Sequence, residues 1–201
     1  CRHNNEFTIA TPDKVHFIDV SPKQIVSVAA ALIPFLEHDD AARASMGANM
    51  QRQSVPLLLR EAPYVATGLE EFAGKDIGRV VIAENAGTIK YVDSKKIIMI
   101  DNKEKEIVYD LIDFSLTTHH TVFYQRPIVN IGDSIKKGKV LADSASTRNG
   151  QISIGHNIRV AFMSWNGANY EDAIIISEKL VREKKFSSIH VEEFICNVRD
   201  T

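Results

Sequence analysis

The chain has 201 residues, 44% of them hydrophobic and 25% charged, which suffices for one large domain or two small ones with a buried core. Its 24 Lys and Arg residues and 26 Asp and Glu residues give a formal net charge of -2. This balance argues against a free-standing nucleic-acid-binding protein, because such proteins gain much of their affinity by neutralising phosphates. Any contact with nucleic acid must therefore depend on a few placed residues within a larger assembly.

The two cysteines, Cys1 and Cys196, lie almost a chain length apart, and no Cys-x-x-Cys pair indicates a zinc or redox site. We expect reduced thiols, with Cys196 buried, as in a cytoplasmic protein. No apolar run approaches the roughly 20 residues that cross a membrane. The chain begins without Met and ends without a closing element, so we expect an internal fragment.

The first quarter of the chain predicts short strands followed by helix. Residues 7–20 alternate loosely between apolar and polar side chains. Ser21–Pro22 then combines an N-cap residue with a proline in the first helical turn. Apolar residues recur at steps of three and four, and Pro34 should end this helix near Leu32. The polar stretch 37–53 that follows is rich in helix formers.

The middle of the chain changes to closely spaced β-type runs. They occur at residues 79–83, 87–92 and 96–100, with turn signals between or after them. Gly132 and Gly138 lie six residues apart among Val and Ile residues, which suits tight turns. Strands this short and this close together predict a barrel or a sandwich.

The last third predicts further strands around one short helix. The expected strands are residues 158–163, 173–176 and 190–198. A polar loop over 164–172 separates the first two, and an amphipathic helix over 177–185 should turn Leu180 and Val181 inward.

Glu171 and Asp172 are adjacent carboxylates at the junction between this polar loop and the strand expected after it. Such a pair can bind a hard divalent cation, directly or through its waters. Successive side chains of a strand point to opposite faces, so at most one of the two reaches a given ion directly. From these residues alone, a solvated turn is the favoured explanation of the pair.

Arg43 also has two interpretations. It follows Asp39 by four residues on the predicted helix, so an ordinary surface ion pair is expected. Alternatively its planar guanidinium grips a phosphate. Asn49, Gln51 and Gln53 carry amides that read sugar hydroxyls and base edges, or that simply cover an exposed helix face.

Two long strings are far more specific than these local patterns. Residues 33–56 contain Glu-His-Asp-Asp and Met-Gly-Ala-Asn-Met-Gln-Arg-Gln, and residues 160–178 contain Trp-Asn-Gly and Tyr-Glu-Asp. Both closely resemble the β subunit of bacterial-type, multisubunit DNA-dependent RNA polymerase. Residues 139–147 and 198–201 resemble the same subunit in the same order, so the resemblance covers essentially the whole chain.

The resemblance implies an α+β, β-rich fold that is incomplete at both ends. Residues 1–63 would form a helical segment that borders the active centre, downstream of the main rifamycin pocket. Residues 64–201 would form a double-psi-like β-barrel region that binds the RNA–DNA hybrid and runs up to the flap.

The resemblance also implies a nucleotidyltransferase that synthesises RNA from nucleoside triphosphates on a DNA template. Its partners would be the β′ subunit, the α dimer, ω and sigma factor, together with template DNA and nascent RNA. The cofactor would be Mg²⁺, with its principal ligands on β′. We expect the isolated fragment to be inactive and its setting to be the cytoplasm, with an organellar origin left open.

Carried over residue by residue, the resemblance places Arg43 at the triphosphate of the incoming nucleotide. Glu171 and Asp172 match the acidic pair near the second, nucleotide-borne magnesium, and would act through water or by ordering neighbouring groups. Asn49 and Gln53 match polar positions near the RNA 3′ end and the nucleotide.

Ala42 departs from the family pattern, because many members carry Asn directly before the residue that corresponds to Arg43.

Two other interpretations of the sequence remain open. In one, the lysines 136–137 before Gly138 form the turn of a small β-barrel carrier domain, although the usual methionine neighbours are missing. In the other, the acidic and basic residues only hold subunits together in a structural scaffold.

Overall fold

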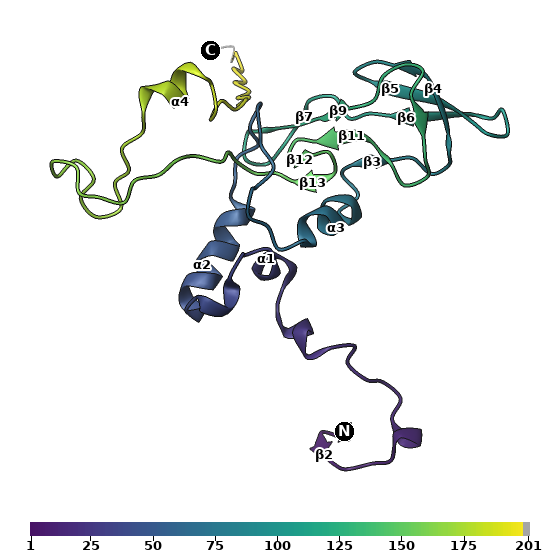
Figure 1. Ribbon diagram of the computed structural model, residues 1–201, viewed down its shortest axis with the longest axis vertical. Coiled ribbons are helices and arrows are strands. Elements are labelled where there is room, and N and C mark those ends of the chain that lie inside the picture. Colours follow the sequence, from purple (N-terminus) through teal and green to yellow (C-terminus); the bar gives the residue numbers. More distant parts are fainter. Residues whose placement is uncertain (199–201) are drawn as a thin grey trace.

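The structure is a computed structural model that describes residues 1–198 (Figure 1). Residues 199–201, which belong to one of the family-like strings, lie outside the described residues. The helices are η1 (Pro12–Lys14), η2 (Pro22–Ile25), α1 (Val28–Ala31), η3 (Leu36–His38), α2 (Ala41–Arg52), α3 (Leu69–Asp76) and α4 (Glu178–Arg182), where η marks a 3-10 helix. The strands are β1 (Arg2–His3), β2 (Glu6–Phe7), β3 (Val81–Ile82), β4 (Gly87–Val92), β5 (Lys96–Asp101), β6 (Glu106–Asp110), β7 (Ser115–Leu116), β8 (Val122–Phe123), β9 (Gln125–Pro127), β10 (Ser134–Ile135), β11 (Val140–Ser144), β12 (Thr147–Arg148) and β13 (Gln151–Ile152).

The helix predicted after Ser21 forms as two short pieces, because a second serine restarts it. The hydroxyl of Ser21 accepts the amide of Lys23 and begins η2. Ser27 then accepts the amide of Ala30 and begins α1. The helix ends at Ala31, with Leu32 as its C-cap, so the predicted end is confirmed. The strands expected over 7–20 are wrong apart from the end of β2 at Phe7, and this arm extends away from the rest of the chain (Figure 1).

The helix α2 confirms the prediction over the polar stretch. Asp40 caps it by accepting the amide of Ala42 at 3.0 Å. Its buried side consists of small residues, with Ala48 only 7% exposed. A Cβ added at Gly47 would lie 3.7 Å from the Cδ1 atom of Ile33, so α2 approaches the segment after α1 closely.

The β-rich part contains one four-stranded and one three-stranded antiparallel sheet. The first has the strand order β10-β4-β5-β6 and the second β3-β11-β9. One hydrophobic core joins them, with Ile89, Ile97 and Met99 from the first sheet and Leu141 from the second. Gly132 and Gly138 have φ angles of 89° and 84°, which confirms the predicted tight turns.

The helix α3 packs on β13 beside this core. Its start is fixed by Glu70, whose carboxylate accepts the amides of Thr67 and Gly68, both at 2.8 Å. Burial works to raise the pKa of Glu70, but these amides, its own backbone and the Thr67 hydroxyl together lower it.

The expected closed barrel is not seen among residues 1–198, where the fold is mixed α/β and rich in small sheets. The sheets of this part have four, three or two strands, and none closes on itself. A barrel needs every edge strand to be paired. The strands expected over 158–163, 173–176 and 190–198 are absent, and of these residues only His190 makes a β-bridge, to Thr121.

Other expectations for the last third have mixed outcomes. The helix after Ser177 is confirmed as α4, and Leu180 is half-buried, but Val181 is 71% exposed. Cys196 is exposed rather than buried, because the apolar run around it packs against nothing in the described chain. Both cysteines are free thiols, as expected. No helix within residues 1–198 is long and apolar enough to cross a membrane.

Candidate functional site

The helix α2 presents a continuous polar and methionine-rich face to solvent. Five of its exposed residues recur at steps of three and four, which places them along one side of the helix. They are Arg43, Met46, Asn49, Met50 and, at the C-cap, Gln53. The opposite side contains the small residues packed against α1 and its following turn. The sequence-predicted residues Arg43, Asn49 and Gln53 therefore share a single surface, which we call the α2 face.

Arg43 does not form the expected ion pair with Asp39. Within residues 1–198 its guanidinium makes no ion pair, and its one recorded contact runs from Nη1 to the sulfur of Met46 at 3.8 Å. Asp39 lies ahead of α2 rather than on it, and Asp40 is occupied as the N-cap. The positive charge of Arg43 is thus available to an anion outside this part of the chain.

Glu171 and Asp172 lie in a loop whose shape is fixed by Asn169. The Oδ1 atom of Asn169 accepts the amide of Trp165 at 2.8 Å, and its Nδ2 atom donates to the carbonyl of Met163 at 2.6 Å. Glu171 has a φ angle of 56°. The junction with a strand is therefore wrong: the two carboxylates occupy a turn, and both are exposed.

Two neighbouring carboxylates do not make a complete metal centre. A divalent cation such as Mg²⁺ takes six ligands, mostly oxygens and waters. No group of three or more potential metal ligands occurs among residues 1–198. Nor does any hydrogen bond or ion pair of these residues join the loop to the α2 face. The pair can contribute to a cation held mainly by other groups.

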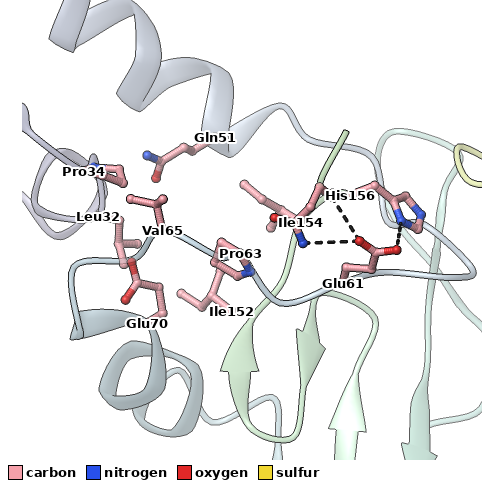
Figure 2. A pocket seen from close by; sticks show the side chains of 12 residues that line it. Leu32, Pro34, Gln51, Glu61, Pro63, Val65, Glu70, Ile152, Ile154 and His156 are labelled. Carbon is pink, nitrogen blue, oxygen red and sulfur yellow. Dashed lines mark hydrogen bonds and ion pairs between the residues drawn. The ribbon is translucent and has the colours of Figure 1, made fainter. Parts of the chain in front are cut away.

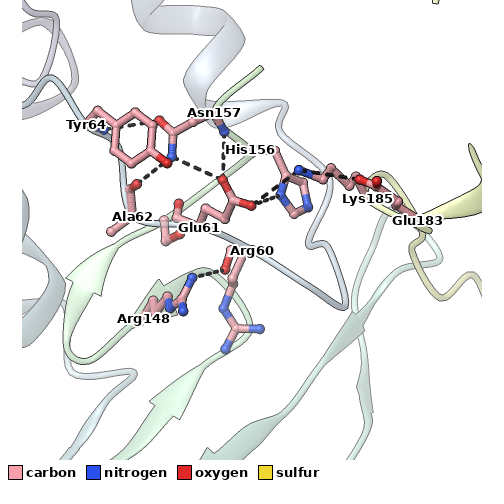
Figure 3. A network of polar contacts seen from close by, with 10 residues as sticks. Arg60, Glu61, Ala62, Tyr64, Arg148, His156, Asn157, Glu183 and Lys185 are labelled. Atoms are coloured by element: carbon pink, nitrogen blue, oxygen red, sulfur yellow. Dashed lines mark hydrogen bonds and ion pairs between the residues drawn. The ribbon is translucent and has the colours of Figure 1, made fainter. Parts of the chain in front are cut away.

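A polar network that the sequence did not reveal is centred on Glu61 (Figure 3). Its Oε2 atom accepts the backbone amide of Asn157 at 3.2 Å and the side-chain amide at 3.3 Å. Its Oε1 atom lies 3.3 Å from Nδ1 of His156 and 3.7 Å from Nζ of Lys185. The Asn157 backbone, the imidazole and the Asn157 side chain lower the pKa of Glu61 to about 2, so it is ionised at neutral pH.

His156 covers this network with a buried ring. Its side chain is only 3% exposed, and its ring packs edge-on against Phe186 at 6.0 Å. Neither ring nitrogen makes a hydrogen bond, so the short distance to Glu61 is not a well-aligned contact. The imidazole thus lies packed between Phe186 and the Glu61 carboxylate, whose pKa it helps to lower.

The residue before Glu61 ties the same segment to the β-rich part. Arg60 donates from Nε to the carbonyl of Thr147 and from Nη2 to that of Ser144, both at 2.6 Å. Its Nη1 atom donates to the hydroxyl of Tyr124 at 3.1 Å. Arg148 in turn donates to the carbonyl of Arg60 at 3.2 Å. The segment around Arg60 and Glu61 is thus held from both sides.

Two hollows border this segment. One, of about 250 Å³, separates the helical part from the β-rich part and is lined mainly by apolar side chains, with Gln51, Glu61 and Glu70 at its margins (Figure 2). The other, of about 530 Å³, contains both Arg60 and Lys185 but also Glu61, Asp143 and Glu183. Because its charges nearly balance, the second hollow does not define an anion site.

Two comparisons with known proteins identify relatives of this sequence. Residues 82–201 match the family described as RNA polymerase Rpb2, domain 6. The whole chain is 49% identical, over 205 aligned residues, to the DNA-directed RNA polymerase subunit beta of Treponema pallidum (strain Nichols). It spans 17% of the length of that relative.

These matches cover the chain from end to end and include more than half of it in one family. The chain is a fragment-length member of a multisubunit polymerase family. It belongs to the β-subunit family of DNA-directed RNA polymerases. Lysines 136–137 are exposed at the turn before Gly138, as a carrier domain would need, but the family assignment is against that interpretation.

Proposed function

We propose that this chain is the portion of a polymerase β subunit that borders the active centre of a DNA-directed RNA polymerase. The whole enzyme would be a nucleotidyltransferase that assembles RNA from nucleoside triphosphates on a DNA template. One observation carries the proposal: the α2 face presents Arg43, Asn49 and Gln53 together, with no carboxylate among residues 1–198 paired to the arginine.

Arg43 would contact the triphosphate of the incoming nucleotide. Charge builds on the leaving pyrophosphate during phosphoryl transfer, and a fixed guanidinium stabilises that charge. Its planar donors suit phosphate oxygens better than a lysine would. Asn49 and Gln53, on the same face, would hydrogen-bond sugar or base groups near the RNA 3′ end and the nucleotide.

Glu171 and Asp172 would assist the second, nucleotide-borne magnesium ion through its water ligands. In a two-metal site the ions clamp the attacking and leaving oxygens of the displacement. An exposed pair of carboxylates on a turn is suited to accept hydrogen bonds from metal-bound water. The principal ligands would belong to the β′ subunit.

The fold proposal follows the same division of the chain. Residues 1–63 would be the helical segment beside the active centre, and residues 64–201 would complete a double-psi-like barrel when neighbouring parts of the subunit supply the missing strands. The apolar residues 158–163 support this, because they are exposed here and alternate like strand residues.

The proposed partners are β′, the α dimer, ω, sigma factor, template DNA and nascent RNA, in the bacterial cytoplasm. The net charge of -2 agrees with a nucleic-acid channel whose basic surface is shared between subunits.

Nucleotide-addition kinetics of a reconstituted polymerase test this function. We expect Arg43→Ala to reduce kcat/KM for nucleotides by roughly 10- to 150-fold, the equivalent of about 1.5–3 kcal/mol for a charge-assisted contact. Arg43→Lys keeps the charge but loses the planar fork, and should fall between Arg43→Ala and the parent enzyme.

Arg126→Ala is the matched control, because it removes an exposed arginine of strand β9, away from α2, whereas Arg52 donates a hydrogen bond to Asn49 of the α2 face. If Arg43→Ala leaves the kinetics unchanged and only weakens subunit assembly, the structural-scaffold interpretation is favoured instead.

A further inference from the structure

The exposed segment 158–184 leaves the body of the chain and returns to it at one place. Figure 1 shows it leaving after β13 and returning through α4. At its start, the amide of Glu61 donates to the carbonyl of Gly155 at 2.9 Å. At its end, the amide of Leu58 donates to the carbonyl of Ser187 at 3.0 Å. The two ends therefore dock on neighbouring residues of a single strand-like segment.

One side chain reaches both ends. The Oε2 atom of Glu61 holds the start, through the backbone and side-chain amides of Asn157 at 3.2 and 3.3 Å. Its Oε1 atom faces the end, 3.7 Å from Nζ of Lys185 (Figure 3). Lys185 and Asn157 are 28 positions apart in the sequence, so the Glu61 carboxylate contacts the residues at both ends of a long loop-like segment.

Between these points, the polar contacts of the segment 158–184 in the described chain are made within the segment or with the residues directly after it. Examples are those of Asn169 and the turns of α4. Ion pairs of this segment likewise stay between neighbouring residues, as in Lys179 with Glu183. The position of the segment relative to the body is thus set at its base.

Glu61 is itself firmly placed. Its carbonyl accepts the hydroxyl of Ser153, and the carbonyl of the preceding Arg60 accepts the guanidinium of Arg148. The buried ring of His156 lies against the carboxylate, with Nδ1 3.3 Å from Oε1. An ionised acceptor with two separately used oxygens can join two chain segments that make few other contacts.

We infer that Glu61 is a positioning residue that fastens both ends of the segment 158–184 and thereby fixes where Glu171 and Asp172 lie. The fastening stands on the contacts above. Its consequence for nucleotide addition rests on the proposed function of the acidic pair, so the two parts need separate measurements.

The test uses Glu61→Gln in a whole reconstituted polymerase. The glutamine keeps the size of the side chain but loses its charge and one acceptor oxygen. Glu71→Gln is the matched control, because Glu71 is an exposed carboxylate bonded to Lys75 at 2.6 Å on α3, away from the segment 158–184. Hydrogen–deuterium exchange reports on the fastening, and nucleotide kinetics at several Mg²⁺ concentrations report on its consequence.

We expect Glu61→Gln to speed exchange of peptides within 158–184 roughly 10-fold, while peptides of β4 and β5 keep the parent rate. Glu71→Gln should leave 158–184 unchanged. Lys185→Met, which releases only one end, should give a smaller increase in the same peptides. Unchanged exchange of 158–184 in both Glu61→Gln and Lys185→Met overturns the fastening.

For nucleotide addition we expect Glu61→Gln to lower kcat roughly 10-fold at limiting Mg²⁺, with partial recovery at high Mg²⁺. In a variant that already carries Glu171→Ala and Asp172→Ala, the further change to Glu61→Gln should have no additional effect, because both act through one loop. Multiplicative losses overturn the positioning role. Faster exchange combined with normal kinetics of the Glu171→Ala, Asp172→Ala variant instead rejects the proposed function of the acidic pair and leaves the fastening intact.

Discussion

Two helical glycines should respond in opposite directions to the same substitution. Gly74, on α3, faces the backbone of the β12–β13 turn: an added Cβ would stand 2.2 Å from the carbonyl oxygen of Gly150. Gly47, on α2, would place its Cβ 3.7 Å from the Cδ1 atom of Ile33, which is ordinary van der Waals contact. The pair therefore separates close backbone packing from intrinsic helix propensity.

The magnitudes follow from these distances. Replacing a helical glycine by alanine stabilises by about 0.5–1 kcal/mol when nothing obstructs the methyl group. Overpacking costs about 1–3 kcal/mol, and a backbone obstacle places Gly74→Ala at the upper end of that range. We expect a net loss of about 2 kcal/mol for Gly74→Ala, and a gain of about 0.5–1 kcal/mol for Gly47→Ala.

Hydrogen–deuterium exchange of the whole β subunit measures both effects locally. A loss of about 2 kcal/mol accelerates exchange roughly 30-fold in peptides covering α3 and β12–β13. The gain at Gly47 should slow exchange over α2 by roughly two- to five-fold. Parent-like exchange around α3 in Gly74→Ala, or acceleration of α2 in Gly47→Ala, would refute the packing described for these helices.

Three further outcomes are expected. Asp143→Asn should destabilise the β12–β13 turn by about 2–3 kcal/mol, seen as faster local exchange, because the buried carboxylate accepts the amides of Asn149 and Gly150 at 2.6 and 2.7 Å. Leu141→Ala should cost about 2–5 kcal/mol in urea unfolding of the subunit, because its side chain is fully buried between the two larger sheets. Glu61 has a pKa of about 2 here against a usual 4.5, so it stabilises the fold above pH 4.5 and loses that contribution as the pH falls toward 2. Acid titration followed by exchange of 155–157 should show this loss in the parent and not in Glu61→Gln.

The sequence predicted α2 well because its cap and its helix formers are local signals. The sequence did not predict which side of α2 packs against the rest of the chain. The buried side holds Ala44, Gly47 and Ala48, whereas Met46 and Met50 are exposed. The methionines face solvent, whereas the side that approaches α1 and the segment after it carries mainly small residues.

The strands of the last third were mispredicted for a physical reason. Alternating residues such as Val160 and Phe162 have strong β propensity, yet a strand forms only when a neighbour supplies hydrogen bonds. Phe162 is 98% exposed, so no neighbour is present in the described chain. The alternating sequence predicts a tendency to form a strand, but it does not say whether a neighbouring strand is present to pair with it.

Part of the candidate site was predicted from the sequence and part was found only in the structure. Arg43, Asn49 and Gln53 came from a family resemblance, and the structure adds that they share one face. The network of Glu61 could not be predicted, because its partner Asn157 is 96 positions away and neither residue belongs to a recognisable motif. Contacts of this range depend on the packing of the whole β-rich part.

The most direct test of the central claim is to locate the incoming nucleotide. A nucleotide with a photoreactive group on its γ-phosphate, bound in a halted elongation complex of the whole polymerase, marks whatever lies beside the triphosphate. We predict labelling of residues 41–53, strongly reduced by Arg43→Ala and retained in Arg126→Ala. Labelling that avoids α2, or that is indifferent to Arg43→Ala, would contradict the placement of the α2 face at the triphosphate.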